Sequence, residues 1–392
     1  MDLREKALEL HERNRGKIEI KLKTKIDNKD DLSLAYTPGV AEPCKEIDQD
    51  SENVYKYTNK GNLVAIVTDG TAVLGLGDLG PLGAYPVMEG KAALFKSFAN
   101  VDAIPICLNT KDVDEIVQTV KNIAPTFGGI NLEDIGSPRC FEIEKRLIEE
   151  LDIPVFHDDQ HGTAVIVLAA LINALKVVDK KMSDIKVVIN GIGAAGSAIA
   201  KILLAAGVKK MDLVQRYGIV YEGAEGNNFM QNDLAKIVNP EGKKGSLTEA
   251  LIGADVFIGV SKGNLVTTEM VRQMNQKAIV FAMANPVPEI YPEEALAGGA
   301  LVVGTGRSDF PNQINNVLVF PGIFKGALKA RARKISEEMK VKAAYAIANV
   351  IDEKDLAPDY IIADVFNKEV AKAVANAVEK EAYESNLAKI DN

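Results

Sequence analysis

The sequence predicts an α/β protein whose parallel β-sheets form two domains, followed by a helical C-terminal region. Short apolar runs alternate with helical segments through most of the 392 residues, which is typical of strand–helix–strand units. The runs are almost continuously apolar, as expected for central strands covered on both faces. From about residue 322 onward the pattern is helical only.

The N-terminal half of this pattern predicts an α/β domain over residues 1–160. Its first segment is charged and helix-like, without the apolar core of a signal peptide. Helices are expected between or after the strands, at 84–98, 111–123 and 139–151. The expected strands are 62–70, 101–108, 128–135 and 154–159.

A second domain is expected over residues 161–392, including the C-terminal helices. The apolar run at 164–175 is too short to span a bilayer, so we expect a buried helix over 161–178 that separates the two domains. The strands expected after it are 185–193, 211–216, 255–261, 278–284 and 300–306. Strand ends beside this boundary lie where open α/β sheets bind ligands.

Composition limits the classes of partner. Hydrophobic residues make up 47% and charged residues 26% of the chain, as in ordinary globular proteins. A net charge of −9 argues against nucleic acid or an anionic membrane as the main partner, but allows a small-molecule substrate. Three cysteines without CxxC spacing predict reduced thiols and a cytoplasmic location. The amphipathic terminal helices would suit a homodimer.

The motif G-x-G-x-x-G occurs twice. "GIGAAG" at 191–196 follows a strand directly and opens a helix, so its backbone N–H groups and helix dipole would face a pyrophosphate. It predicts a Rossmann-like, doubly wound dinucleotide-binding domain. "GLGDLG" at 75–80 is followed by Pro81 and Gly83, where we expect a tight, close-approach loop and no immediate helix. The cofactor-binding residues predicted from "GIGAAG", the second motif in chain order, are Gly191, Gly193, Ala194, Ala195 and Gly196.

The residues after the next strand bear on the choice of dinucleotide. An acidic residue that binds the ribose of NAD is expected about 20 positions after the motif, and Gln215 followed by Arg216 stands there. A neutral residue beside a cation suits a 2′-phosphate, so we predict that NADP is used at least as well as NAD. The alternative is that Arg216 is a solvated loop arginine.

Carboxylates stand at the C-terminal ends of three of the expected N-terminal strands: Asp69, the pair Glu133–Asp134, and the pair Asp158–Asp159. The carboxyl ends of parallel strands meet at one sheet edge, so these groups can cluster. Clustered carboxylates repel one another unless a cation neutralises them, and oxygen ligands favour Mg²⁺ or Mn²⁺.

Zinc is the competing hypothesis, because His157 and His161 have i,i+4 spacing. A zinc pair of this kind requires both histidines on one helix face. We expect His157 on a strand and His161 in the following turn, which favours the hard cation.

Two further residues are candidates for proton transfer. Lys91 stands among apolar residues of a helix, which predicts partial burial and a depressed pKa; a surface lysine is the alternative. Tyr36 lies in the Pro/Gly-constrained segment "LSLAYTPGVAEPC" and could equally be a packing residue.

Together these motifs resemble the malic enzymes of the short prokaryotic type, over roughly residues 15–335. The resemblance is carried in order by "AYTPGVAEPC", "VTDGTAVLGLGDLGPLGAYPVMEGKAALF", "NLEDI", "FHDDQHGTA", "GIGAAG", "ANPVPE" and "GRSDFPNQINNVLVFPGIFKGAL". It implies oxidative decarboxylation of (S)-malate to pyruvate and CO₂ with NAD(P)⁺ and Mg²⁺ or Mn²⁺, and decarboxylation of oxaloacetate.

The resemblance also implies a role for each matching residue. Lys91 matches the general base and Tyr36 the general acid, while Asp158 supports the third metal ligand. The matched metal ligands are Glu133, Asp134 and Asp159, and the positions that contact substrate or the nicotinamide side are Asn285, Asn315 and Asn316.

Two positions depart from the family pattern. Larger members carry an arginine where this chain has Ala72, so the cation for the second substrate carboxylate is unassigned and Arg307 is a candidate. The family commonly has Asp where this chain has Gln215. The alternatives are a malolactic enzyme, which releases lactate, and a catalytically dead nucleotide- and metal-binding regulatory protein.

Overall fold

The computed structural model describes residues 2–73 and 75–390. Its first sheet has four parallel strands, as the apolar runs predicted, and their order is β2-β1-β3-β4. The strands are β1 (Leu63–Thr68), β2 (Asp102–Cys107), β3 (Gly129–Leu132) and β4 (Val155–His157). The connecting helices are α5 (Gly80–Ala99), α6 (Val113–Ile123) and α7 (Arg139–Glu150).

The start of α5 corrects one expectation. This helix begins at Gly80, directly after the "GLGDLG" loop, where no immediate helix was expected. Pro81 occupies the first turn of α5, and a proline is tolerated there because the first N–H groups of a helix have no intrahelical partner.

The second sheet has the order β10-β9-β8-β5-β6-β7, parallel except for β7, which pairs antiparallel with β6. Strand order that reverses about β5 confirms the doubly wound, Rossmann-like fold. The strands are β5 (Lys186–Asn190), β6 (Lys210–Gln215), β7 (Gly218–Ile219), β8 (Val256–Gly259), β9 (Ala278–Ala282) and β10 (Ala300–Thr305). The associated helices are α9 (Ala194–Ala205), α10 (Phe229–Val238), α11 (Leu247–Leu251), α12 (Thr268–Arg272) and α13 (Pro292–Ala297).

Helix α8 (Asp158–Val178) connects the two sheets. Every residue from Ala164 to Leu175 is buried, which confirms the predicted buried helix. Among the described residues it is the one helix long and apolar enough to cross a membrane, and 78% of its most apolar window is buried in this fold. Packing inside the protein therefore accounts for its apolar composition.

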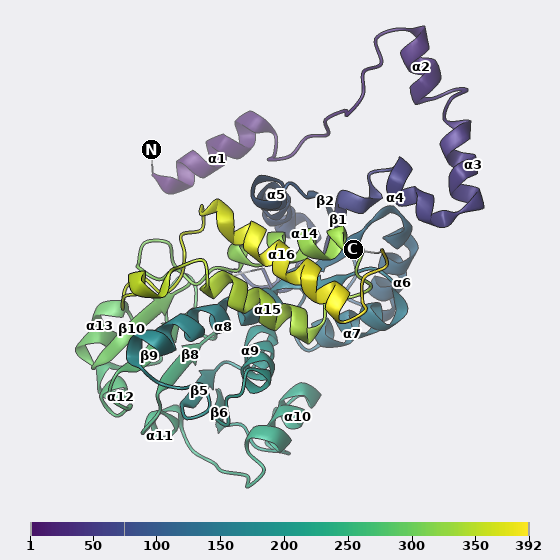
Figure 1. Ribbon diagram of the computed structural model, residues 1–392. Coiled ribbons are helices and arrows are strands. Elements are labelled where there is room, and N and C mark those ends of the chain that lie inside the picture. Colours follow the sequence, from purple (N-terminus) through teal and green to yellow (C-terminus); the bar gives the residue numbers. More distant parts are fainter. Residues whose placement is uncertain (1, 74, 391–392) are drawn as a thin grey trace.

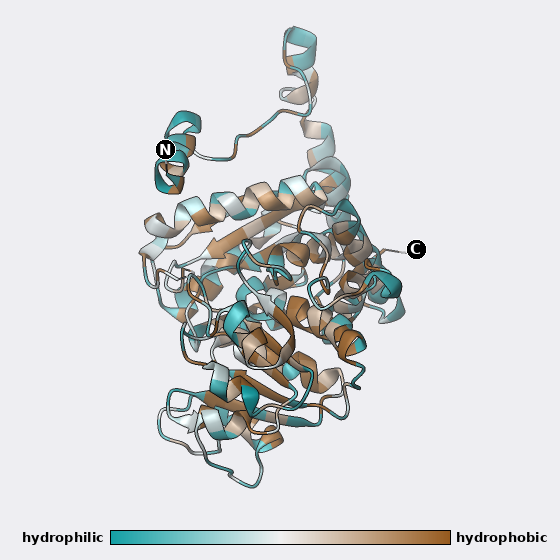
Figure 2. Ribbon diagram, turned by 90° about the vertical axis from the view of Figure 1, so that its left-hand side faces the viewer, coloured by the Kyte–Doolittle hydropathy of each residue, from teal (hydrophilic) through white to brown (hydrophobic). Residues whose placement is uncertain are grey.

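The C-terminal helices cover the junction of the sheets and return to the first one. Figure 1 shows α15 (Glu337–Ala348) and α16 (Lys368–Glu384) lying side by side in front of α8. Helix α14 (Phe320–Lys329) packs on α5, with the ring of Phe95 4.8 Å from that of Phe320 and 5.4 Å from that of Phe324. In Figure 2 the strands and the helix faces toward them are the apolar parts of the molecule.

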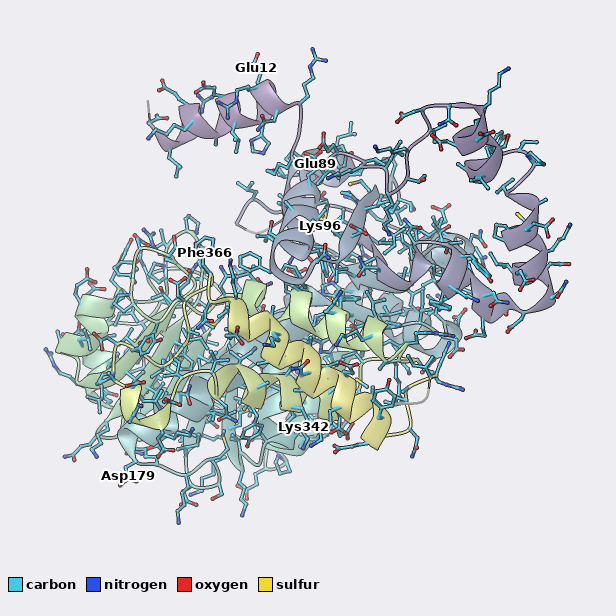
Figure 3. All side chains as sticks on the ribbon, turned by 45° about the horizontal axis from the view of Figure 1, so that its top comes forward. Glu12, Glu89, Lys96, Asp179, Lys342 and Phe366 are labelled. Atoms are coloured by element: carbon cyan, nitrogen blue, oxygen red, sulfur yellow. The ribbon has the colours of Figure 1, made fainter. Side chains whose placement is uncertain are left out.

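The N-terminal segment forms an arm that extends from this body (Figure 1). Its helices α1 (Leu3–Asn14), α2 (Lys29–Ala35) and α3 (Ala41–Gln49) have no buried residue, and α4 (Val54–Tyr57) leads into β1. In Figure 3 the side chains of the arm, including the labelled Glu12, stand apart from the body. Large apolar side chains are exposed along it, for example Ile20 (91%) and Leu34 (79%).

Candidate active site

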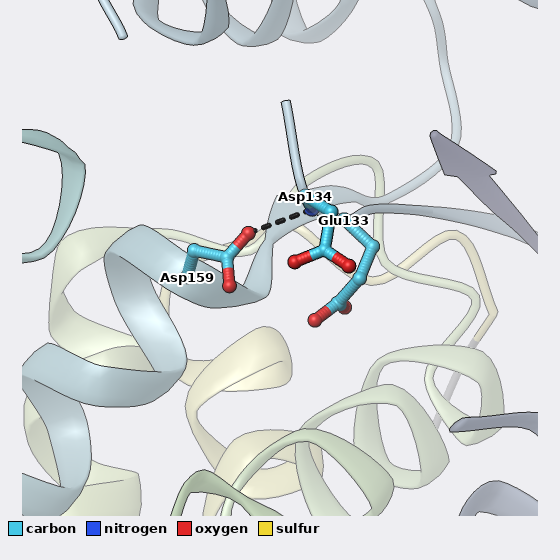
Figure 4. Close-up of side chains that lie close together, drawn as sticks. All are labelled: Glu133, Asp134 and Asp159. Atoms are coloured by element: carbon cyan, nitrogen blue, oxygen red, sulfur yellow. Dashed lines mark hydrogen bonds between the residues drawn. The ribbon is translucent and has the colours of Figure 1, made fainter. Parts of the chain in front are cut away.

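Three carboxylates meet where β3 and β4 end. Glu133 and Asp134 directly follow β3, and Asp159 lies in the first turn of α8, directly after β4. Because these parallel strands are neighbours, one oxygen of each side chain lies within 4.8 Å of the others. The backbone N–H of Asp134 donates to Oδ2 of Asp159 over 2.8 Å (Figure 4). The predicted clustering is confirmed for these three residues.

The electrostatics of this cluster disfavour three ionised carboxylates and favour an added positive charge. Burial and the carboxylates of Asp159 and Glu133 raise the pKa of Asp134 to about 9. Burial raises the pKa of Glu133 to about 7, although Lys91 opposes the shift. Within the described residues, nothing donates a hydrogen bond to the buried Oδ2 of Asp134. A donor set made only of carboxylate oxygens fits a hard divalent cation.

Asp69 does not join the cluster, contrary to our expectation. The guanidinium of Arg139 lies 2.8 Å from its Oδ2, and the hydroxyl of Thr71 donates to its Oδ1 over 2.6 Å. Arg139 is distant in sequence and stands at the start of α7, so this ion pair arises from the tertiary fold. Asp69 thereby holds the loop after β1.

Lys91 is buried beside the carboxylate cluster. Its Nζ lies 2.5 Å from Oδ2 of Asp158 and 3.0 Å from Oε1 of Glu133, and 4.1 Å from the ring centroid of Phe320. The predicted burial is confirmed, but the predicted depressed pKa is wrong. Burial lowers the pKa of Lys91, but the attraction of Asp158 and Glu133 outweighs it and raises the pKa above its ordinary value.

Asp158 links this lysine to a distant asparagine. The side-chain amide of Asn316 donates to Oδ2 of Asp158 over 2.5 Å. The neighbouring Asn315 is occupied differently, because its Oδ1 accepts the backbone N–H of Val317 and caps the short 3₁₀ helix Asn316–Leu318. Asn316 therefore contacts Asp158, the partner of Lys91, and Asn315 caps the short helix in which Asn316 lies.

Asn285 follows β9 and lies beside the loop of the first glycine motif. A Cβ placed at Gly75 would be 3.3 Å from the backbone oxygen of Asn285, and Gly75 has φ +70°. The loop therefore approaches another part of the chain closely, as predicted.

The guanidinium of Arg307, the candidate for the second substrate carboxylate, already has protein partners. It donates to the two carboxylate oxygens of Asp309 at 2.8 and 2.6 Å and to the carbonyl of Pro286 at 2.6 Å.

Tyr36 lies apart from these groups. It directly follows α2 in the arm and is 66% exposed, and α2 stands away from the body in Figure 1. Within one chain the structure does not bring Tyr36 together with Lys91.

The second glycine motif forms the turn that was predicted for a dinucleotide. Helix α9 begins at Ala194, and a Cβ at Gly196 would lie 1.9 Å from the backbone oxygen of Gly191. Gly196 therefore allows the helix to close on the strand end. A cavity of about 1170 Å³ opens beside the turn. Its lining includes Gly191, Gln215, Arg216, Tyr217, Ser246 and Lys262.

The two histidines are not arranged as a zinc pair. His161 lies in α8 and not in a turn, and both its ring nitrogens have protein partners: Glu144 at 2.9 Å and Lys340 at 3.0 Å. Sequence reasoning missed Glu144. It stands on the apolar face of α7 between Cys140 and Leu147, and a carboxylate in an apolar stripe was the available signal.

A glycine-rich turn at a doubly wound sheet, with a carboxylate cluster and a buried lysine at a second sheet, defines a two-domain nicotinamide-dependent oxidoreductase. The chain belongs to the malic enzyme family. Residues 14–148 match the malic enzyme N-terminal domain and residues 160–383 the malic enzyme NAD binding domain.

Individual relatives cover almost the whole chain. The bifunctional malic/malolactic enzyme of Bacillus subtilis (strain 168) is 60% identical over 391 residues, which are 100% of this chain and 95% of that protein. The NAD-dependent malic enzyme of Geobacillus stearothermophilus is 60% identical, covering 96% of this chain and 79% of that protein. A crystal structure of malic enzyme from Pyrococcus horikoshii Ot3 has a TM-score of 0.96 and 50% identity, covering 100% of this chain and 93% of that chain.

Proposed function

We propose that this chain converts (S)-malate to pyruvate and CO₂ with reduction of NAD(P)⁺, using a divalent cation at Glu133, Asp134 and Asp159. The observation that carries the proposal is the contact of buried Lys91 with this cluster, 3.0 Å from Glu133. The proposed acid–base residue Lys91 and the proposed cation ligands are thus close enough to act on one small substrate. We also propose that the chain divides into residues 1–160 for substrate and metal and 161–392 for the dinucleotide.

The three carboxylates are the residues that would hold Mg²⁺ or Mn²⁺. When bound, the cation supplies Lewis-acid polarisation of a substrate oxygen. Among the described residues, the buried Oδ2 of Asp134 lacks a hydrogen-bond partner, so it is free to act as a ligand.

Lys91 exchanges a proton with the C2 oxygen of malate. The hydroxyl proton leaves as hydride passes from C2 to the nicotinamide, so the lysine must first transfer its own proton. The carboxylate of Asp158, 2.5 Å from Nζ, is placed to accept it. Asn316 donates to the same Asp158 oxygen and orients that carboxylate. Asn285 and Asn315 lie on the segments that would contact substrate or the nicotinamide side.

Tyr36 is proposed as the general acid that protonates C3 of the enolpyruvate. Because one chain leaves Tyr36 exposed in an arm with apolar side chains, we propose a homodimer in which the arm supplies Tyr36 of the partner subunit. Co-expression of Tyr36→Phe and Lys91→Ala chains tests this. Half of randomly formed dimers are hybrids with one complete site, so about a quarter of wild-type activity is expected. Activity equal to that of the separate variants would show that Tyr36 acts within its own chain.

For the dinucleotide, Gly191, Gly193, Ala194, Ala195 and Gly196 would bind the pyrophosphate. Gln215 and Arg216 line the adjoining cavity, and we propose that NADP is used at least as well as NAD. The NAD-dependent relative named above makes NAD the competing cofactor.

The experiment is a steady-state assay of malate with NAD or NADP, with and without Mn²⁺, in which NMR identifies the product. Pyruvate and NAD(P)H in equal amounts, only with Mn²⁺, support the proposal. Lactate without net cofactor reduction supports a malolactic activity, which the relative named as bifunctional makes the second candidate.

We propose a cytoplasmic location, since Cys44, Cys107 and Cys140 are free thiols.

A further inference from the structure

Glu144 of α7 is buried against the first turn of α8. Its side chain is 8% exposed and accepts three hydrogen bonds from that turn. The donors are the backbone N–H of His157 at 2.8 Å, the side-chain amide of Gln160 at 3.2 Å and Nε2 of His161 at 2.9 Å. These donors lie on both sides of Asp158 and Asp159 in the sequence. The carboxylate of Glu144 therefore holds the turn that carries both aspartates.

The protonation of His161 follows from its second contact. Nζ of Lys340 lies 3.0 Å from Nδ1 of His161, and an ammonium group can only donate. Nδ1 is therefore the acceptor, and Nε2 carries the proton that is donated to Glu144. Lys340 is itself held by Glu337 at 2.7 Å. The carboxylate of Glu144 is thus fixed by a chain of contacts that extends from α8 to α15.

The turn held by Glu144 carries two residues of the proposed site. Asp159 faces Asp134 and accepts a hydrogen bond from its backbone N–H over 2.8 Å. Asp158 holds Nζ of Lys91 at 2.5 Å. Like charges in the cluster favour separation of the carboxylates, and contacts that hold the turn from outside the cluster oppose that separation.

We propose that Glu144 is a positioning residue for the cation site: it fixes the turn that presents Asp159 to the cation and Asp158 to Lys91. Glu144 is not one of the three clustered carboxylates, so it would act through the turn and not as a ligand. The inference rests on the proposed cation site at Glu133, Asp134 and Asp159. In this proposal His161 connects Glu144 to α15 through its contact with Lys340.

The test measures Mn²⁺ binding to the full-length protein without substrate or cofactor, from the EPR signal of free Mn²⁺. Glu144→Gln keeps the size of the side chain but places an amide against donors, and it should weaken Mn²⁺ binding about tenfold, as loss of groups that orient metal ligands commonly does. NADH binding, followed by fluorescence, should stay within about twofold, because its proposed turn belongs to the other sheet. Glu142→Gln is the matched control, since Glu142 lies on the exposed side of α7 and should leave both affinities unchanged.

Glu144→Asp covers the case in which Glu144→Gln does not fold, because it keeps the charge and shortens the side chain by one methylene. It should bind Mn²⁺ more weakly than wild type and more tightly than Glu144→Gln. Wild-type Mn²⁺ affinity in whichever Glu144 variants fold would overturn the inference and leave Glu144 a purely structural residue.

Asp159→Asn separates this failure from failure of the proposed function. If wild type binds Mn²⁺, Asp159→Asn does not, and the Glu144 variants bind as wild type, only the positioning role is lost. If wild type and Asp159→Asn show the same absence of binding, the cation site itself is wrong and the inference falls with it.

Discussion

Nζ of Lys91 lies 2.5 Å from Oδ2 of Asp158, both side chains are buried, and the two residues come from different elements, α5 and α8. This contact joins the proposed proton-transfer residue to the turn that also carries Asp159. The proposed acid–base group and the proposed cation site are therefore parts of one unit.

Removal of the lysine should slow the hydride step strongly and spare the binding of cation and dinucleotide. We expect Lys91→Ala to lower kcat by a factor of about 10² to 10⁴, the usual contribution of a positioned general base. Mn²⁺ and NADH should still bind, as measured by EPR and fluorescence. Lys96→Ala is the control, because Lys96 is exposed on the same helix and pairs with Asp102. Near-normal turnover in Lys91→Ala would remove this residue from its role.

Divalent cation should stabilise the protein through the carboxylate cluster. At a Mn²⁺ concentration of about 100 times Kd, a ligand that binds only the folded state adds about 2.7 kcal/mol to the free energy of unfolding. Asp134→Asn removes one of three repelling carboxylates, so in EDTA its Tm should exceed that of wild type. The same variant should lose the increase in Tm with Mn²⁺. Differential scanning calorimetry checks both shifts, and a cation effect that survives in Asp134→Asn would speak against this ligand.

The glycine turn offers a pair of substitutions with different expected outcomes. Gly196→Ala should lower Tm and abolish dinucleotide binding, because its Cβ would meet the backbone oxygen of Gly191. Gly193→Ala should leave Tm unchanged, since a Cβ there meets nothing within 4 Å. It should still weaken NADH binding, because the second glycine lets the backbone approach the pyrophosphate. Thermal melts and NADH titrations would show whether the two variants differ in this way.

Cofactor preference should depend on Arg216. We expect Arg216→Ala to lower kcat/KM for NADP by about tenfold, the effect of losing a charged hydrogen bond worth about 1.4 kcal/mol. The value for NAD should change little. Arg272→Ala is the control, because Arg272 is exposed and pairs with Glu269 on the same helix. Equal losses with both cofactors would show that Arg216 does not contact a 2′-phosphate.

Much of this arrangement could be predicted from the sequence because it depends on local patterns. Apolar runs placed the strands, and parallel strands bring their carboxyl ends to one edge, which united Glu133, Asp134 and Asp159. The same rule placed Asp69 wrongly, because Arg139, far away in the chain, captures it.

Two other misses also have tertiary causes. Apolar neighbours correctly indicated that Lys91 is buried, but the direction of its pKa shift depends on Asp158 and Glu133, which come from other elements. The anchoring contacts of Glu144 join α7 to α8 and, through His161, to α15. No pattern within one segment predicts such contacts.

The proposed function depends above all on a hard cation bound by the three carboxylates beside Lys91. The most direct measurement is anomalous diffraction from crystals grown with Mn²⁺. We expect one strong peak coordinated by oxygens of Glu133, Asp134 and Asp159. A peak at His157 and His161, or none at the carboxylates at a Mn²⁺ concentration that saturates activity, would contradict it.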